Sequence, residues 1–221
     1  MTFKRNSVEY TEIKAHVSWG ANSKVNNDAM IFNASDSKNC PSYHAGLCQV
    51  GNACFMQKCE SRYPALQPYH IRQGVLWQKY NPVEFGLTML EIASDARTKK
   101  FTEFRFGESG DFKNPVQLQW FATLCQVLRG DGITTYGYTA RTDLDLTALI
   151  ANSQLNLSND DYGSAQFQAM GANRFKAVLT YTGNADAICP CETLKEKEIA
   201  HPCGSCNFCK VHTGLIEERL T

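Results

Sequence analysis

From Pro82 onward, segments with helical patterning alternate with segments of strand-like patterning, and this alternation restricts the fold more than any other feature. Helices are predicted over Pro82–Ala96, Pro115–Leu128, Leu144–Ala151 and Ala165–Met170. Strands are predicted over Phe101–Phe106, Thr134–Thr139, Leu155–Ser158 and Phe175–Tyr181. Because helical segments separate the strands, the strands must pair in parallel through crossover connections. The alternation therefore predicts a parallel α/β sheet, either open or closed into a barrel.

The missing nucleotide-binding motif and the strand count together favour the barrel. No G-x-G-x-x-G follows a strand, and Gly107–Gly110 is not a phosphate-binding loop, so a dinucleotide-binding sheet has little support. About six strands are too few for a complete eight-stranded barrel but suit a partial one. The expected fold class is α/β, a partial or distorted (βα) TIM-like barrel with cysteine-rich metal-binding loops at both ends. It forms a single domain over residues 1–221.

The N-terminal part has a less regular pattern. A strand is expected from about Ile13 to Trp19, followed by a polar, loop-like stretch that contains the short apolar run Ala29–Phe32. Two short helices are expected between Cys54 and Tyr80, interrupted by prolines.

Two predicted strands carry polar residues on one side. Glu103 and Arg105 alternate with Phe104 and Phe106, although strands of a parallel sheet covered on both faces normally have continuous apolar runs. Two interpretations remain open: the polar side is a functional lumen, or the charges pair with neighbours to fill the barrel.

Polar side chains also follow the strands. Barrel enzymes build their active sites from the loops at the carboxyl ends of the strands. This predicts catalytic or substrate-positioning roles for Glu108, Asp111 and Arg141. No Ser-His-Asp or Cys-His-Asp arrangement can be argued from the sequence, and His44 is the one histidine of interest because it lies between cysteines.

Nine of the ten cysteines fall into two groups, an N-terminal loop over residues 40–59 and a C-terminal cluster over residues 189–209. A chain of 221 residues buries a core without disulfides, so stability alone does not explain them. The N-terminus has no signal-peptide run and no stretch suits a membrane span, so we expect a cytoplasmic protein with reduced thiols. In that compartment, clustered cysteines indicate metal ligands. The tenth, Cys125, lies among apolar helix residues and is expected in the core.

The C-terminal group has the stronger metal-binding pattern. Cys203, Cys206 and Cys209 form two consecutive C-x-x-C steps, and Cys189 or Cys191 can supply a fourth thiolate. This set suits a 4Fe-4S cluster or a tetrahedral zinc ion, and the close spacing favours the cluster.

The N-terminal group is spaced C-x7-C-x5-C-x4-C, which matches no common zinc module. For Cys40, Cys48 and Cys54, in a loop rich in turn residues, metal ligation is the favoured interpretation. Cys59 lies in a helical segment and fits ligation and simple burial equally well. One cluster or two are therefore possible.

Charge composition bears on the partners. Lys plus Arg and Asp plus Glu are 22 each, so the formal net charge is zero. Nucleic-acid binding is not indicated by this balance, because such proteins usually carry a basic excess. The expected partner is a small-molecule substrate or an electron donor. We expect no interaction with a membrane.

Several short motifs in a fixed order resemble the phage gene eighty-eight protein family. They are Asn22-Ser23-Lys24, Phe32-Asn33, Asn39-Cys40-Pro41, Cys54-Phe55, Arg62-Tyr63-Pro64, Ser109-Gly110-Asp111-Phe112, Tyr136-Gly137-Tyr138-Thr139 and the C-terminal C-x2-C-x2-C.

That family is similar in pattern to the radical S-adenosylmethionine superfamily, whose partial barrel holds a 4Fe-4S cluster after an early strand. The resemblance implies a cluster on Cys40, Cys48 and Cys54, and a cofactor-binding role for Gly107 and Glu108 toward the methionine amine of S-adenosylmethionine. The spacing differs from the superfamily's C-x3-C-x2-C, and Gly107-Glu108 lacks the second glycine of its Gly-Gly-Glu segment.

Two functions follow as hypotheses. The first is a phage-type 4Fe-4S cluster-binding protein in the host cytoplasm, acting either through cluster binding alone or as a redox or radical-type enzyme with its site at the barrel rim. The second is a zinc-stabilised module that binds a host protein or nucleic acid.

Overall fold

The computed structural model describes residues 2–20, 28–48, 50, 54–95, 100–158, 162–178, 185–189, 206 and 208–219. The helices are α1 (Val8–His16), α2 (Pro41–His44), α3 (Phe55–Arg62), α4 (Leu66–Leu76), α5 (Pro82–Asp95), α6 (Pro115–Gly130), α7 (Thr147–Asn152) and α8 (Tyr162–Ala169). The strands are β1 (Ser18–Trp19), β2 (Ala29–Phe32), β3 (Glu103–Phe106), β4 (Thr134–Thr139), β5 (Gln154–Leu157), β6 (Asn173–Val178), β7 (Ala187–Ile188) and β8 (Leu215–Arg219).

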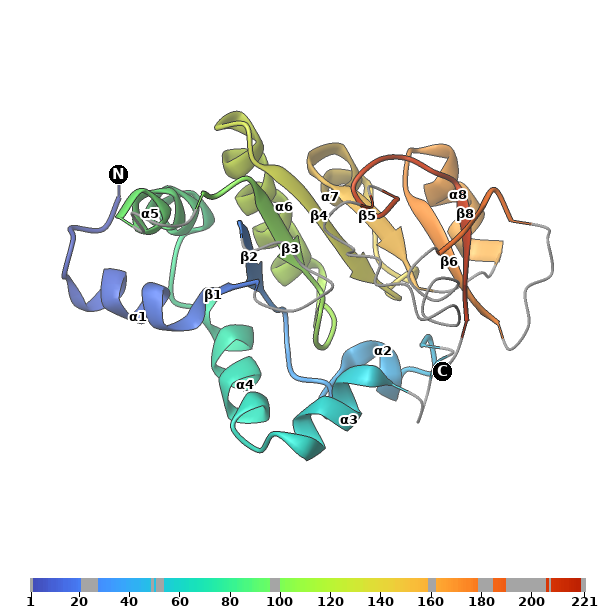
Figure 1. Cartoon of the computed structure of the whole chain (residues 1–221), viewed down its shortest axis with the longest axis horizontal. Coiled ribbons are helices and arrows are strands. Elements are labelled where there is room, and N and C mark those ends of the chain that lie inside the picture. Colours follow the sequence, from blue (N-terminus) through green and yellow to red (C-terminus); the bar gives the residue numbers. More distant parts are fainter. Residues whose placement is uncertain are drawn as a thin grey trace.

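The strands form one eight-stranded sheet in the order β1-β2-β3-β4-β5-β6-β8-β7 (Figure 1). Every neighbouring pair is parallel except β1 with β2, which is antiparallel. The parallel α/β sheet is thus confirmed, but the barrel is not. Within the described residues the sheet is open, because its edge strands β1 and β7, of two residues each, pair only with β2 and β8.

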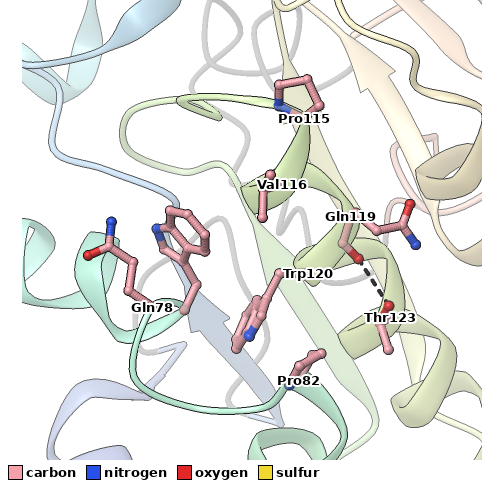
Figure 2. A pocket seen from close by; sticks show the side chains of 8 residues that line it. Gln78, Pro82, Pro115, Val116, Gln119, Trp120 and Thr123 are labelled. Carbon is pink, nitrogen blue, oxygen red and sulfur yellow. Dashed lines mark hydrogen bonds between the residues drawn. The ribbon is translucent and has the colours of Figure 1, made fainter.

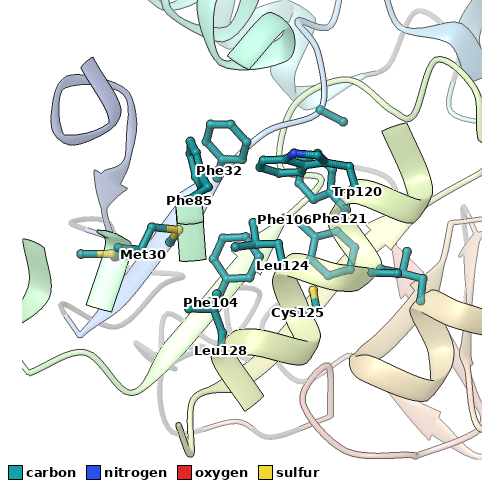
Figure 3. Close-up of a cluster of buried hydrophobic side chains, with 14 of the residues drawn as sticks. Met30, Phe32, Phe85, Phe104, Phe106, Trp120, Phe121, Leu124, Cys125 and Leu128 are labelled. Carbon is teal, nitrogen blue, oxygen red and sulfur yellow. The ribbon is translucent and has the colours of Figure 1, made fainter. Parts of the chain in front are cut away.

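The strand order explains why one face of the sheet holds the core. Strands β2 to β6 lie side by side in chain order, so crossovers of one hand place the connecting helices on one face. Phe32, Phe85, Phe106, Trp120 and Phe121 pack there (Figure 3), with ring centroids 4.9 Å apart for Phe32 and Phe85.

Close packing within this core also dictates a glycine on β4. A Cβ on Gly137 would lie 2.2 Å from the Phe106 ring of β3, so the ring occupies the space of the missing side chain.

From β3 to the start of β6, the opposite face of the sheet carries mainly polar side chains, as the alternation on β3 predicted, whereas β2 contributes Ala29 and Ile31 to it. Strand pairing puts Arg105 beside Tyr136, Tyr138 beside Asn156, and Asn156 beside Asn173. Paired residues of parallel strands point to the same side. We call this side, from Glu103 and Arg105 through Tyr136, Tyr138 and Asn156 to Asn173, the polar face.

Helices α2, α3 and α4 lie along the lower edge of the sheet in Figure 1, where strands β2, β3 and β4 end. A hydrogen bond of 2.6 Å from the Ser42 hydroxyl on α2 to the Asp111 carboxylate after β3 joins this layer to the sheet. The segment that contains the N-terminal cysteines is therefore at the carboxyl edge of the strands.

The predicted strand over Ile13–Trp19 is wrong in its first half, because Ile13 belongs to α1. The Ser7 side chain caps this helix by accepting the backbone N–H of Tyr10 at 3.1 Å. Tyr10 and Ile13, three positions apart, both face the core. The run Ala29–Phe32, expected within a loop, is β2 and is buried at all four residues.

The remaining predicted helices and strands have counterparts in the structure, with shifts of a few residues at their ends. Strands β7 and β8 were not predicted. Among the described residues, no helix has the length and apolar character needed to cross a bilayer.

Candidate functional site

Two loops interlock at the carboxyl edge, one after β2 and one after β3. The Asn33 side-chain oxygen accepts the backbone N–H groups of Glu108 at 2.9 Å and of Ser109 at 3.0 Å. Gly110 has a φ of +63°, and a Cβ there would lie 2.0 Å from the Ser35 hydroxyl. These contacts fix where the loop carries Glu108 and Asp111.

Asp111 is buried, and groups of the protein itself donate hydrogen bonds to all the acceptor positions of its carboxylate. The hydroxyls of Ser42 and Thr139 donate to it at 2.6 and 2.7 Å, and the backbone N–H groups of Phe112 and Ala140 donate at 2.8 Å each. An ionised carboxylate has about four lone-pair positions, so none is left for a substrate. Burial raises the pKa of Asp111 above its usual value, although these hydrogen bonds oppose the shift. The geometry makes Asp111 a structural junction between α2, β3 and β4, and does not support the predicted catalytic role.

The Arg141 guanidinium also makes its hydrogen bonds within the protein. Its Nε and Nη2 donate to the two carboxylate oxygens of Asp143 at 2.7 and 2.9 Å, and its Nη1 donates to the Phe112 carbonyl. The guanidinium thus holds the loop after β3 to the loop after β4, which leaves little capacity to bind a substrate.

Glu108 is the one predicted catalytic residue with a partly exposed, loosely held side chain. Its carboxylate lies 3.5 Å from Nη1 of Arg105, and 20% of the Glu108 side chain is exposed. The Arg105 guanidinium lies over the Tyr138 ring, 5.4 Å from its centroid. Glu108 and Arg105 therefore form an accessible charged pair where the polar face meets the carboxyl edge.

Gly107, expected to assist cofactor binding, has a packing role in the structure. Its φ is +69°, and a Cβ would lie 2.2 Å from the Tyr138 carbonyl oxygen. Glycine is needed because the loop passes so close to β4.

The N-terminal cysteines flank the short helices of the carboxyl edge. Cys40 precedes α2 and Cys54 precedes α3. Burial raises the pKa of the Cys40 thiol to about 12, and the nearby Asp111 charge adds to the shift. Burial also raises the pKa of Cys59, followed by the effect of the Glu108 charge. In this structure, these two thiols are therefore protonated at neutral pH.

No group of three or more metal-binding side chains occurs among the described residues. Cys40, Cys48 and Cys54 are described but do not form such a group. The cluster that the family resemblance assigns to these three residues is therefore not confirmed.

The described end of the C-terminal cysteine loop, from Phe208 to Val211, is hydrogen-bonded to the polar face. The Asn156 side chain donates to the Cys209 carbonyl at 3.0 Å, and the Asn173 side chain donates to the carbonyls of Phe208 and Val211 at 2.9 Å each. Of its cysteines, Cys189, Cys206 and Cys209 are described, whereas Cys191 and Cys203 lie outside the described residues.

A buried ion pair also holds the C-terminal cysteine loop. Lys210 Nζ lies 2.6 Å from Glu103 Oε1, and both side chains are largely buried. Cys209 is close enough to the polar face for its charge to act on Arg105 and Tyr136. Cys209, one of the predicted C-terminal ligands, thus lies near the polar residues of β3 and β4.

Sequence reasoning missed a buried charged group between α3 and α4. The Glu60 carboxylate lies 2.7 Å from His70 Nδ1 and accepts the hydroxyls of Ser37 at 2.6 Å and Ser109 at 2.8 Å. Both serines bond to the carboxylate, and neither bonds to the imidazole, so this is not a nucleophile–base pair. No spacing motif marks the group, because its members come from four separate segments.

Two pockets among the described residues have no predicted site residue in their lining. One, of about 760 Å³, is lined mainly by Pro82, Pro115, Val116 and Trp120 between the start of α5 and the start of α6 (Figure 2). Another, of about 540 Å³, includes Lys210 and residues at the amino ends of β4 and β5.

Cys125 is in the core, as predicted.

Comparison with known proteins gives one match. A family model described as gene product 88, a phage family, matches residues 3–212. No curated protein and no solved structure matches the chain, so the comparisons add no support for a resemblance to radical S-adenosylmethionine enzymes. Because the matched region covers nearly the whole sequence, the chain belongs to the gene product 88 family.

Proposed function

We propose that this protein binds a 4Fe-4S cluster through its C-terminal cysteines, with Cys203, Cys206, Cys209 and either Cys189 or Cys191 as ligands. The observation that supports the proposal is the anchoring of Phe208, Cys209 and Lys210 on the polar face by Asn173, Asn156 and Glu103, respectively. A cluster needs closely spaced thiolates held by backbone of fixed position, and this loop combines the C-x2-C-x2-C spacing with such anchors.

A cluster at this place would supply one-electron transfer to a small molecule or from an electron donor. The chain's own contribution is the charged pair of Glu108 and Arg105, which would position an ionic substrate beside the loop. Asp111 and Arg141 are left out of this role because their hydrogen bonds are already made within the protein. The proposal places the protein in the host cytoplasm, where its thiols stay reduced.

The N-terminal cysteines enter the proposal separately. Cys40, Cys48 and Cys54 would hold a second cluster only after the segment rearranges, since no ligand group of three exists among the described residues. Iron content that is unchanged in Cys48→Ala would remove them from the proposal. S-adenosylmethionine is not included, because the conformation of Gly107 is accounted for by its contact with β4.

The second candidate is a structural zinc ion in the same loop. Four thiolates also satisfy tetrahedral zinc, and the protein would then act as a binding module for a host protein or nucleic acid.

Anaerobic purification followed by iron, sulfide and zinc analysis separates the two candidates. The cluster predicts brown protein with broad visible absorbance that is lost in Cys206→Ala and retained in Cys125→Ala, a matched variant in the core. Colourless protein with stoichiometric zinc would overturn the cluster in favour of zinc. Protein without either metal would overturn both.

A further inference from the structure

Arg105 is the least satisfied charged group of the polar face. Its Nε is buried and has no hydrogen-bond partner. The Glu108 contact, at 3.5 Å, involves Nη1 alone and is at the long limit for a hydrogen bond. A buried guanidinium donor without a partner costs free energy, so such a group indicates a missing ligand.

The neighbours of Arg105 do not supply this partner. Glu103, two positions earlier on β3, is paired with Lys210 at 2.6 Å. Tyr138 presents its ring face to the guanidinium, and Tyr136 is beside Arg105 on the adjacent strand. An aromatic ring face stabilises a guanidinium by a cation–π interaction, but it does not accept hydrogen bonds from the guanidinium N–H groups in the ring plane.

The geometry of the guanidinium indicates which ligand would fit. Because the ion pair with Glu108 uses Nη1, the edge formed by Nε and Nη2 stays available. That edge carries two parallel N–H donors, the arrangement that binds a carboxylate or phosphate group through two hydrogen bonds. The Arg105 side chain is 18% exposed but its Nε atom is buried, so binding of an oxyanion at this edge requires neighbouring side chains to shift.

We propose that Arg105 is the anchor of a binding site for the oxyanion group of a small molecule, with Glu108 as a competing internal anion. The oxyanion binds the Nε–Nη2 edge, the negative charge of Glu108 on Nη1 opposes its binding by repulsion, and the Tyr138 ring lies over the guanidinium. The site is formed by β3, β4 and the loop after β3, so it does not depend on any metal in the cysteine loop.

Isothermal titration of the purified full-length protein with inorganic phosphate and, separately, with succinate tests the site. We expect saturable binding of one of the two probes, and the probe that binds distinguishes a phosphate ligand from a carboxylate ligand. Arg105→Gln should weaken binding by roughly tenfold or more, because it removes a charge-assisted pair of hydrogen bonds. Arg72→Gln, at an exposed position on α4, is the matched control and should bind as the parent does.

Glu108→Gln keeps the proposal testable if Arg105→Gln does not fold. Removing the competing carboxylate should tighten binding, by about threefold or more. If neither probe binds to the parent or to Glu108→Gln, or if Arg105→Gln binds as tightly as the parent, the proposal is overturned.

The same titration on Cys206→Ala separates this inference from the metal proposal. Retained oxyanion binding in a metal-free variant supports a site independent of the cysteines. If oxyanion binding disappears together with the metal, the independence of the site is refuted while the cluster proposal stands.

Discussion

Glu60 and Asp111 are both buried carboxylates at the carboxyl edge, but their surroundings shift their pKa values in opposite directions. Burial alone would raise the pKa of Glu60, yet hydrogen bonds from Ser37, His70 and Ser109 outweigh it and hold the pKa below the usual value. For Asp111 the effect of burial prevails. The ionised form of Glu60 therefore stabilises the fold, whereas burial makes ionisation of Asp111 costly in spite of the four hydrogen bonds that its carboxylate accepts.

Glu60→Gln should lower the free energy of unfolding at pH 7 by about 2–4 kcal/mol, because it breaks a buried charged network. A lowered pKa in the folded state means that the stabilisation is complete above the ordinary glutamate pKa of 4.5 and is lost as the pH falls through the folded-state pKa. The difference between variant and parent should therefore shrink toward pH 3. Urea unfolding followed by circular dichroism at pH 7, 5 and 3 measures it.

Glu84→Gln, in the first turn of α5, is the control for Glu60→Gln and should change stability little at any of these pH values. An equal effect of both substitutions at pH 7 would contradict the stabilising role of Glu60.

Gly110 allows a second test at the scale of a single residue. Both Gly110 and Gly132 have positive φ, but a Cβ on Gly132 would meet no atom within 4 Å, whereas one on Gly110 would meet Ser35. Gly132→Ala should cost about 1–2 kcal/mol from backbone strain alone. Gly110→Ala should cost about 1–3 kcal/mol more because the two loops must separate. Thermal unfolding of both variants compares them, and equal losses would show that the loops do not interlock.

The segment from Phe208 to Gly214, at the end of the C-terminal cysteine loop, is held by the Asn173 side chain. The Asn173 side chain donates to the carbonyls of Phe208 and Val211, and its oxygen accepts the backbone N–H groups of Thr213 at 2.6 Å and Gly214 at 3.2 Å. One amide thus satisfies four backbone groups and links the loop to the first residue of β6.

Asn173→Ala should release this loop without unfolding the helices. We expect faster amide hydrogen exchange in peptides that cover residues 208–214, measured by mass spectrometry, because their backbone partners are lost. The control is Asn152→Ala, at the end of α7, whose side chain donates to the Ala148 carbonyl within its own helix. Unchanged exchange in the loop of Asn173→Ala would mean that other contacts hold it.

At the scale of the whole molecule, the last described strand is internal to the sheet. β8 lies between β6 and β7 and pairs in parallel with both. The C-terminal segment therefore contributes to the body of the fold and is not an appendage.

A chain that ends at Gly214 lacks β8 and should lose cooperative unfolding or aggregate, because the long β6 edge becomes unpaired. A chain that ends at Arg219 keeps the strand and should remain monodisperse. Size-exclusion chromatography and urea unfolding distinguish the two. A well-folded chain ending at Gly214 would show that the other strands suffice.

An element of the fold could be predicted from the sequence when the interactions that form it join residues close together in the chain. The helices and strands from Pro82 to Val178 were predicted because periodicity and end signals such as Asn114, which caps α6, act over a few residues. The helix at Ile13 was missed although Ser7 is a local N-cap signal, because the apolar residues that face the core, Tyr10 and Ile13, form too short a pattern to separate helix from strand. β8 was missed because its pairing with β6 joins segments far apart in the chain.

The candidate site divides in the same way. Alternation on β3 by itself determined that Glu103 and Arg105 share a polar face, since side chains of a strand alternate with a period of two. The cysteine spacing determined the candidate metal ligands. Only the tertiary structure decided that the sheet stays open and that the Asp111 carboxylate has its hydrogen bonds made within the protein. It also decided that Lys210 pairs with Glu103, which is 107 positions away in the sequence. Such contacts depend on how the chain returns to one face of the sheet, and short-range patterns do not encode that.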